Sequence, residues 1–151
     1  MNRKQSEVSS LSAPPRRQRT LALAIAIALG HVAPSHAADF IWLGGAGNFN
    51  TANWSSPGFP NAATADLFID GGNALDSTVD LNVSSTIGNL SLDLGDTLNI
   101  LESRALTING SITNNGTLSV NGAASFAQLL VVDAVTLGGT GETVLADSAQ
   151  S

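Results

Sequence analysis

Short runs of alternating apolar and small polar residues make up most of the chain between Val79 and Val120. The runs are Val79–Val83, Leu90–Leu94, Thr97–Ile100, Leu106–Ile108 and Thr117–Val120. Alternation with period two places the apolar side chains on one face of a β-strand. Asn-Gly pairs, which turn a chain sharply, occur at Asn109-Gly110, Asn115-Gly116 and Asn121-Gly122, six residues apart. No proline follows Pro60, which suits continuous β pairing, so we expect an all-β fold.

Two spacings relate these runs to one another. The Thr-Leu units of 97–100, 117–120 and 136–139 lie 20 and 19 residues apart, which is the length of one turn of a parallel β-helix. Apolar residues also recur every six residues, at Leu94, Ile100, Leu106, Ile112, Leu118, Ala124 and Leu130. A six-residue spacing suits a triangular turn with three faces. Both spacings predict a short parallel β-solenoid with aliphatic stacks inside.

The alternative fold is an antiparallel β-sandwich, in which each Asn-Gly pair would close a two-residue hairpin. We favour the solenoid because the Thr-Leu-x-Ile/Val units recur and because asparagine falls at the expected corners. The low charge between Thr97 and Val132, on a chain that is otherwise acidic, also favours it.

The N-terminal 37 residues have the three zones of a secretory signal. A polar, cationic region precedes nine apolar residues, Leu21 to Leu29, which are about half the length of a membrane-spanning helix. Small residues at Ser35 and Ala37 predict cleavage between Ala37 and Ala38. We therefore expect export, with membrane contact only during export. The alternative is an N-terminal helix that is buried or anchors the chain in a membrane.

The residues after position 37 exclude several function classes. This part has eleven carboxylates and one cation, Arg104, a formal charge of −10, so we expect no nucleic-acid binding. It has no cysteine for disulfides and no histidine to activate a serine or bind zinc, iron or copper. We interpret the aspartates Asp76, Asp80, Asp93 and Asp96 as solvated corner residues rather than a glycosidase pair. The chain is therefore predicted not to be an enzyme.

We expect no cofactor, with calcium as the one ion left open. The segment 138–146 is similar to a glycine-rich calcium nonapeptide, but Thr143 replaces its aspartate and there is one copy.

Aromatic residues concentrate near the predicted new N-terminus. Trp42, Phe49 and Trp54 are candidate ligand-binding residues, because they could form a platform for sugar rings. The alternative is that they cover the first turn of the solenoid, since an open solenoid end needs a cap and large aromatics are usually buried. The predicted organisation is a signal peptide at 1–37, an aromatic cap module at 38–73 and solenoid turns at 74–151.

Two groups of motifs carry a family resemblance. A tryptophan, a glycine-rich turn and Asn-Trp lie within Trp42–Ser55, followed by Pro60 and the strand Ala65–Ile69. With the runs Leu106–Gly110 and Asn114–Gly122, this pattern resembles autotransporter passengers and filamentous-haemagglutinin-like adhesins of Gram-negative bacteria. The resemblance covers about Phe40 to Gly141. It implies a right-handed parallel β-helix that is extracellular or displayed at the outer-membrane cell surface, usually for adhesion.

These observations predict a non-enzymatic surface or extracellular interaction module of the adhesin type. Its partner would be a glycan or protein on a host or neighbouring cell, contacted along a face of Thr, Ser, Asn and Asp side chains. The alternative function is a polysaccharide-binding or polysaccharide-cleaving β-helix fragment, with Trp42 and Trp54 as stacking residues. Because passengers of this family are longer, a third interpretation is an inert N-terminal fragment of a longer passenger, with no separate activity. Open solenoid ends would allow self-association.

Overall fold

The computed structural model describes residues 38–69, 75–122, 125–132 and 135–147. The predicted export segment 1–37 lies outside the described residues, so its cleavage between Ala37 and Ala38 stays a prediction. The described residues form β-strands and contain no helix. The strands are β1 Asp39–Ile41, β2 Ala46–Asn48, β3 Asp66–Ile69, β4 Thr78–Leu81, β5 Ser85–Ile87, β6 Leu90–Leu92, β7 Thr97–Ile100, β8 Ala105–Ile108, β9 Ile112–Asn114, β10 Thr117–Gly122, β11 Gln128–Val131, β12 Leu137–Gly138 and β13 Glu142–Asp147.

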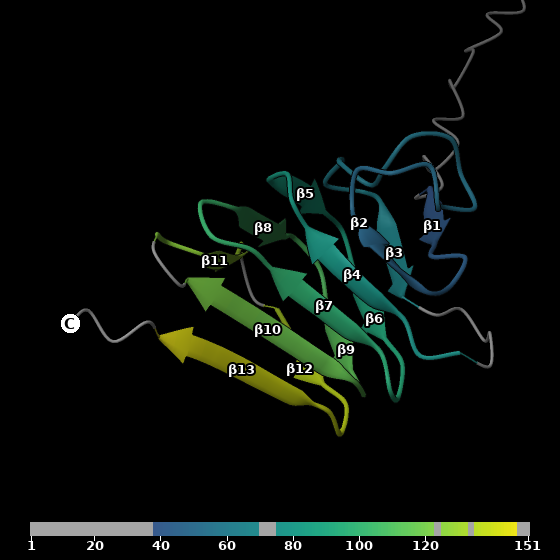
Figure 1. Cartoon of the computed structure of the whole chain (residues 1–151). Helices are drawn as coiled ribbons and strands as arrows, with labels where there is room; N and C mark the ends of the chain where they lie inside the picture. The colour runs from purple at the N-terminus through teal and green to yellow at the C-terminus, as the bar shows by residue number, and fades with distance from the viewer. Residues whose placement is uncertain (1–37, 70–74, 123–124, 133–134, 148–151) are drawn as a thin grey trace, which may run out of the picture. The chain divides into compact units, whose positions relative to one another are not determined.

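The strands form three parallel sheets, which the chain visits in rotation (Figure 1). Sheet I has the order β1-β3-β6-β9-β12, sheet II has the order β2-β4-β7-β10-β13, and sheet III has the order β5-β8-β11. Each full turn therefore gives one strand to each sheet, as in β6-β7-β8, and the result is a parallel β-solenoid of about four turns. All strand pairs in these sheets are parallel, so the solenoid prediction is confirmed and the antiparallel sandwich is wrong.

The expected spacing holds in the middle of the chain and fails after Val120. Thr97–Ile100 pairs with Thr117–Val120 in register, as the 20-residue spacing predicts. The third expected repeat does not follow them, because Leu137 pairs with Ile112 in sheet I. Strand β13 instead pairs with β10, with Leu118 opposite Thr143. The turn that begins at β10 is longer than the one before it, so 136–139 reaches a different face.

The six-residue spacing marks successive faces of the solenoid. Ile100, Leu106, Ile112 and Leu118 are all buried, and they lie on sheets II, III, I and II in turn. The prediction is wrong at the first and the last position of this series, because the Leu94 and Leu130 side chains are exposed. Leu94 lies in the bend between β6 and β7, and Leu130 points outward on the last strand of sheet III. Ala124 lies outside the described residues.

The core consists of aliphatic stacks that run from turn to turn. In sheet II, Val79 pairs with Leu98 and Leu98 with Leu118, and all three side chains are buried. Similar stacks contain Leu81–Ile100–Val120, Leu67–Leu90–Ile112 and Ile87–Ile108. Full burial of one such side chain contributes about 1.5–3 kcal/mol, and no disulfide is available to this cysteine-free chain. The stacks are therefore the main stabilising element.

Asn109-Gly110 and Asn115-Gly116 form corners rather than hairpins, whereas Asn121-Gly122 ends strand β10. The pair at Asn115-Gly116 lies between β9 and β10, where the chain passes from sheet I to sheet II. A Cβ atom on Gly116 would lie 2.3 Å from the Asp96 carbonyl oxygen of the preceding turn, so only glycine lets the turns approach this closely. The neighbouring Asn114 side chain is buried, and its Nδ2 donates to the Glu142 carbonyl oxygen at 2.8 Å. Corner side chains thus tie successive turns together.

Candidate functional site

The three aromatic residues predicted to bind a ligand lie together in the first turn. Trp42, Phe49 and Trp54 are all buried. The ring centroids of Trp42 and Trp54 are 4.8 Å apart, and those of Phe49 and Trp54 are 5.2 Å apart. The Trp42 indole donates to the Gly45 carbonyl at 2.9 Å, and the Trp54 indole donates to the Phe49 carbonyl at 2.8 Å. Stacking on a sugar needs an exposed ring face, so this packing favours the structural role; ligand binding by these residues stays a prediction.

A segment beside these rings runs along the outer edge of β1. Ser55 N donates to the Ile41 carbonyl at 2.8 Å, and Leu43 N donates to the Asn53 carbonyl at 3.0 Å. Trp42 and Trp54 form an antiparallel bridge there. The strands of 38–69 also share sheets I and II with later strands. The first turn is therefore continuous with the solenoid, and its edge is hydrogen-bonded to the chain itself.

Two of the candidate aspartates, Asp80 and Asp96, accept hydrogen bonds from other parts of the fold. Asp76 is exposed, as expected for a solvated corner. Asp96 is fully buried, contrary to that expectation, and its Oδ1 accepts from Ser77 N at 2.6 Å. Asp80 Oδ1 accepts from Asn99 Nδ2 at 2.8 Å on the outer face of sheet II. Within the ranges that the structure describes, no group of three His, Cys, Asp or Glu residues is placed to hold a metal ion.

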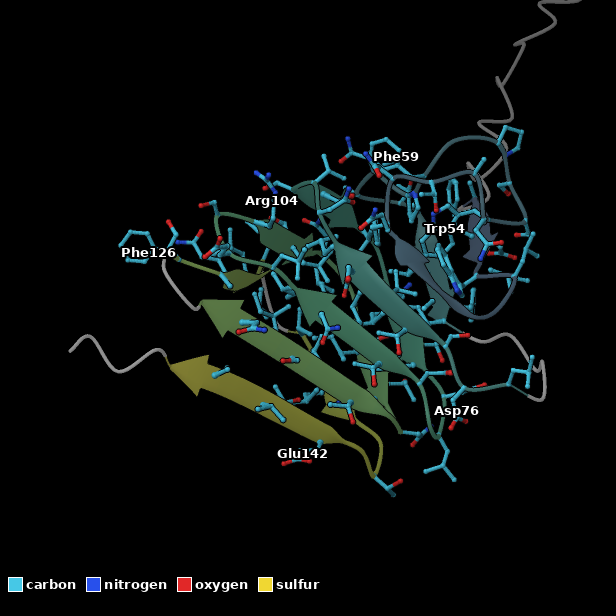
Figure 2. All side chains as sticks on the ribbon, viewed as in Figure 1. Trp54, Phe59, Asp76, Arg104, Phe126 and Glu142 are labelled. Carbon is cyan, nitrogen blue, oxygen red and sulfur yellow. The ribbon has the colours of Figure 1, made fainter. Side chains whose placement is uncertain are left out.

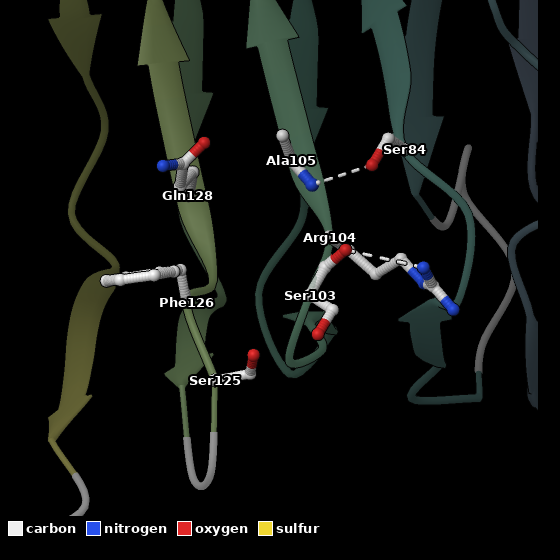
Figure 3. A pocket seen from close by; sticks show the side chains of 7 residues that line it. All are labelled: Ser84, Ser103, Arg104, Ala105, Ser125, Phe126 and Gln128. Carbon is white, nitrogen blue, oxygen red and sulfur yellow. Dashed lines mark hydrogen bonds between the residues drawn. The ribbon is translucent and has the colours of Figure 1, made fainter.

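A groove lies where the chain passes from sheet II to sheet III. It has a volume of about 350 Å³ and is lined by residues of three successive turns: Ser84, Ser103, Arg104, Ala105, Ser125, Phe126 and Gln128 (Figure 3). These residues lie before or at the start of β5, β8 and β11, which stack in parallel as sheet III. The solenoid thus brings together side chains that are about one turn apart in sequence. The groove will be called the corner groove.

Backbone hydrogen bonds hold the corner groove in shape. Ala105 N donates to Ser84 Oγ at 3.0 Å, and Gln128 N donates to the Arg104 carbonyl at 3.0 Å. Ser103 N donates to the Phe126 carbonyl at 2.6 Å. Ser103 has a φ of 60°, the one positive φ among the described non-glycine residues. Left-handed backbone at a non-glycine residue costs about 1–3 kcal/mol and is often found at functional sites.

The two largest side chains of the corner groove are available to a ligand. Arg104 is exposed, and its Nη1 donates to the Ser103 carbonyl at 3.3 Å. Phe126 is 82% exposed and projects away from the ribbon (Figure 2). Figure 3 shows the two side chains pointing to opposite sides, with Ser103 and Ser125 between them and Gln128 on the side of Phe126. A guanidinium binds carboxylates, an aromatic ring packs on apolar or sugar surfaces, and hydroxyl and amide groups accept and donate hydrogen bonds.

The corner groove was not predicted from the sequence, because Arg104 was considered alone and not together with the other residues that line the groove. None of the seven lining residues is a carboxylate, histidine or lysine, so the groove offers contacts but no obvious proton-transfer pair. The signal in the sequence was spacing, because Ser84, Arg104 and Phe126 follow one another at intervals of 20 and 22 residues.

The outer face of sheet II has the regular polar surface expected from the sequence. Thr78 pairs with Thr97, and Thr97 with Thr117, in one row across three turns. A second row contains Asp80, Asn99 and Ser119. This face ends at the corner that leads to the groove, since each strand of sheet II is followed by a strand of sheet III in the full turns.

No helix among the described residues has the length and apolar character needed to cross a membrane. Comparison with models of protein families, with curated proteins and with solved structures gives no significant match to this chain. The resemblance to autotransporter passengers and adhesins therefore rests on the sequence motifs.

Proposed function

We propose that this chain is an exported, non-enzymatic interaction module of the adhesin type. It binds a glycan or protein on another cell surface through the corner groove and the adjoining polar face of sheet II. The observation that carries the proposal is the groove itself, where the one cation after residue 37 and a highly exposed phenylalanine lie beside hydroxyl and amide groups.

The shape of the binding surface supports a role in contact rather than turnover. Rows of side chains on a parallel sheet repeat at about 4.8 Å, so an extended partner meets the same chemistry at each turn. The backbone hydrogen bonds around Ser103 and Arg104 fix the groove before binding, which lowers the entropy cost of association. The lining supplies recognition groups without the acid and base pair that hydrolysis of a sugar bond requires.

Polysaccharide binding is the second candidate, and the exposure of Phe126 favours it. An exposed aromatic ring can stack on a sugar, while Arg104 can pair with the carboxylate of an acidic sugar. In polysaccharide binding of this kind, the sugar binds in the corner groove and not on Trp42 and Trp54, which were the stacking residues expected from the sequence. Acidic glycans are preferred over neutral ones, although the surrounding carboxylates weaken their attraction at low ionic strength.

The experiment compares binding by Arg104→Ala, Phe126→Ala and the double variant with binding by the unaltered protein. Attachment to cells and binding to a glycan array are measured in parallel. Loss of a charge-assisted contact at Arg104 should weaken binding at least about tenfold. Leu94→Ala is the matched control, because Leu94 is also highly exposed but lies in the bend between β6 and β7.

The outcomes separate the two candidates. Loss of cell attachment without any array signal supports the adhesin role, whereas loss of a signal from acidic glycans supports polysaccharide binding. Unchanged attachment and array binding in the double variant would refute the corner groove as the contact site. Release of sugar fragments by the purified protein would refute the non-enzymatic assignment.

A further inference from the structure

Carboxylates are unevenly distributed over the three sheets. The strands of sheet III, β5, β8 and β11, contain no acidic residue, and they lie side by side (Figure 1). Arg104, the one cation after residue 37, directly precedes β8. Sheet III is therefore the face of this acidic chain that repels an anionic partner least. The strands of sheets I and II, in contrast, include Asp39, Asp66, Asp80, Glu142 and Asp147.

The outer face of sheet III becomes apolar along β11. Thr107 alternates with two buried residues and so lies on the outer face of β8, and Leu130 is its partner in β11. Leu130 is 44% exposed, and Val132, two residues further along the chain, is 40% exposed. They lie on the face of the sheet, so a strand beside β11 would lie next to them and not over them. With Phe126 of the corner groove, they will be called the apolar strip.

We infer that the outer face of sheet III, together with the corner groove, binds an acidic segment of a partner protein. The inference rests on the function proposed above and narrows its partner to a polypeptide. A carboxylate of the partner pairs with Arg104, and apolar side chains of the partner pack on the apolar strip. Alternate side chains of an extended segment are about 6.6 Å apart, as they are in β11, so a segment lying along β11 meets successive residues of the strip.

The Arg104 guanidinium is available for this pairing. It is exposed, and in the part of the chain that the structure describes its Nη1 donates to the Ser103 carbonyl at 3.3 Å, which is long for a hydrogen bond. The carboxylate nearest to it in the sequence, Glu102, belongs to the preceding turn. Carboxylates on the other faces repel an anionic segment that approaches there, so they direct it towards sheet III.

The apolar strip favours a polypeptide over a glycan or a membrane. Leu130 and Val132 have no hydrogen-bonding side chain, so a sugar hydroxyl buried against them would lose its water without gaining a partner. Each basic residue contributes about 1 kcal/mol to binding at an anionic membrane surface, and the chain after residue 37 has one such residue against eleven carboxylates. A protein segment supplies a carboxylate and aliphatic side chains within one extended stretch.

The experiment measures binding of the full chain to an array of short synthetic peptides that combine one glutamate with alternating valine and threonine residues. The same peptides with glutamine in place of glutamate, and an array of acidic glycans, are measured in parallel. We expect binding to the glutamate peptides, and at least about tenfold weaker binding to the glutamine peptides or by Arg104→Ala. Leu130→Thr, which extends the outward threonine row of β5 and β8, should weaken binding about fivefold.

Thr107→Glu tests the charge argument, because it places a carboxylate on the outer face of sheet III. It should weaken binding to the glutamate peptides at least about fivefold. Thr113→Glu is the matched control on β9 of sheet I, where Thr113 is exposed, and it should leave peptide binding unchanged. Leu94→Thr is the control for Leu130→Thr, because Leu94 is exposed in the bend between β6 and β7. All four variants should keep the circular dichroism spectrum of the unaltered protein.

The outcomes separate this inference from the proposed function. Failure to bind any of the peptides, with or without binding to acidic glycans, would overturn the inference. Peptide binding that is lost in Arg104→Ala but survives both Leu130→Thr and Thr107→Glu would also overturn it, because the contact would then be confined to the groove. Peptide binding that depends on all three residues, with cell attachment unchanged in the double variant of Arg104 and Phe126, would support this surface and refute the proposed function.

Discussion

The stack formed by Leu81, Ile100, Val120 and Leu145 gives the sharpest test of the energetics. These residues occupy equivalent inward positions of sheet II in four successive turns. Ile100 is fully buried between two neighbours, whereas Leu145 is 76% exposed on the last described strand of sheet II. Replacing each by alanine therefore removes apolar carbon atoms from the same stack in two different environments.

The expected costs differ several-fold. Ile100→Ala leaves a cavity inside the stack and should lower the free energy of unfolding by about 2–5 kcal/mol. Leu→Ala removes three carbon atoms, each contributing about 0.8 kcal/mol when fully buried. Because Leu145 is 76% exposed, only about a quarter of that sum, roughly 0.6 kcal/mol, should be lost.

The assay is equilibrium unfolding in urea, followed by far-UV circular dichroism at the same protein concentration for every variant. Leu94→Ala, which changes an exposed leucine outside the stacks, is the control and should cost less than about 0.5 kcal/mol. Equal losses for Ile100→Ala and Leu145→Ala, measured with the same m value, would refute the exposure gradient along the stack.

Three further substitutions test the corners. Ser103→Gly should stabilise the fold by about 0.5 kcal/mol, because relief of left-handed strain exceeds the added entropy of the unfolded chain; a loss of stability in thermal unfolding would contradict this. Gly116→Ala should cost at least about 2 kcal/mol, since its Cβ would lie 2.3 Å from the Asp96 carbonyl oxygen. The control Gly138→Ala, with its nearest contact at 3.9 Å, should change stability by less than about 0.5 kcal/mol, and equal effects in urea would argue against close packing at Gly116. Asn114→Ala should cost about 2 kcal/mol, because its side chain loses the hydrogen bonds to the Glu142 carbonyl and to the buried Gly116 N–H; faster amide exchange of Gly116 should accompany the loss.

The strands and the central register could be predicted because alternation and spacing are both local signals. Thr97–Ile100 and Thr117–Val120 are alike, and one regular turn separates them, so their pairing follows from the sequence. Beyond Val120 the turns lengthen, and a fixed period then assigns 136–139 to the wrong sheet. A period cannot reveal an inserted residue unless the flanking strands are recognised independently.

The candidate site was less predictable because it is assembled from separate turns. Ser84, Arg104 and Phe126 carry no shared motif, and only the stacking of sheet III brings their corners together. The burial of Asp96 was not predicted for a related reason. Its carboxylate accepts a hydrogen bond from Ser77 N, which lies 19 residues earlier in the sequence. Such contacts depend on register, which must be known before corner side chains can be placed.

Parallel stacking of the turns underlies both the corner groove and the polar face of sheet II, and nuclear Overhauser contacts test it most directly. With assigned methyl groups, Leu98 should show contacts to Val79 and to Leu118, its partners in sheet II. The same spectra should contain no Hα–Hα contact between Thr107 and Ile112, the non-hydrogen-bonded pair that a two-residue hairpin at Asn109-Gly110 would bring together. Such hairpin contacts, together with missing contacts between Leu98 and Leu118, would contradict the solenoid and the site built on it.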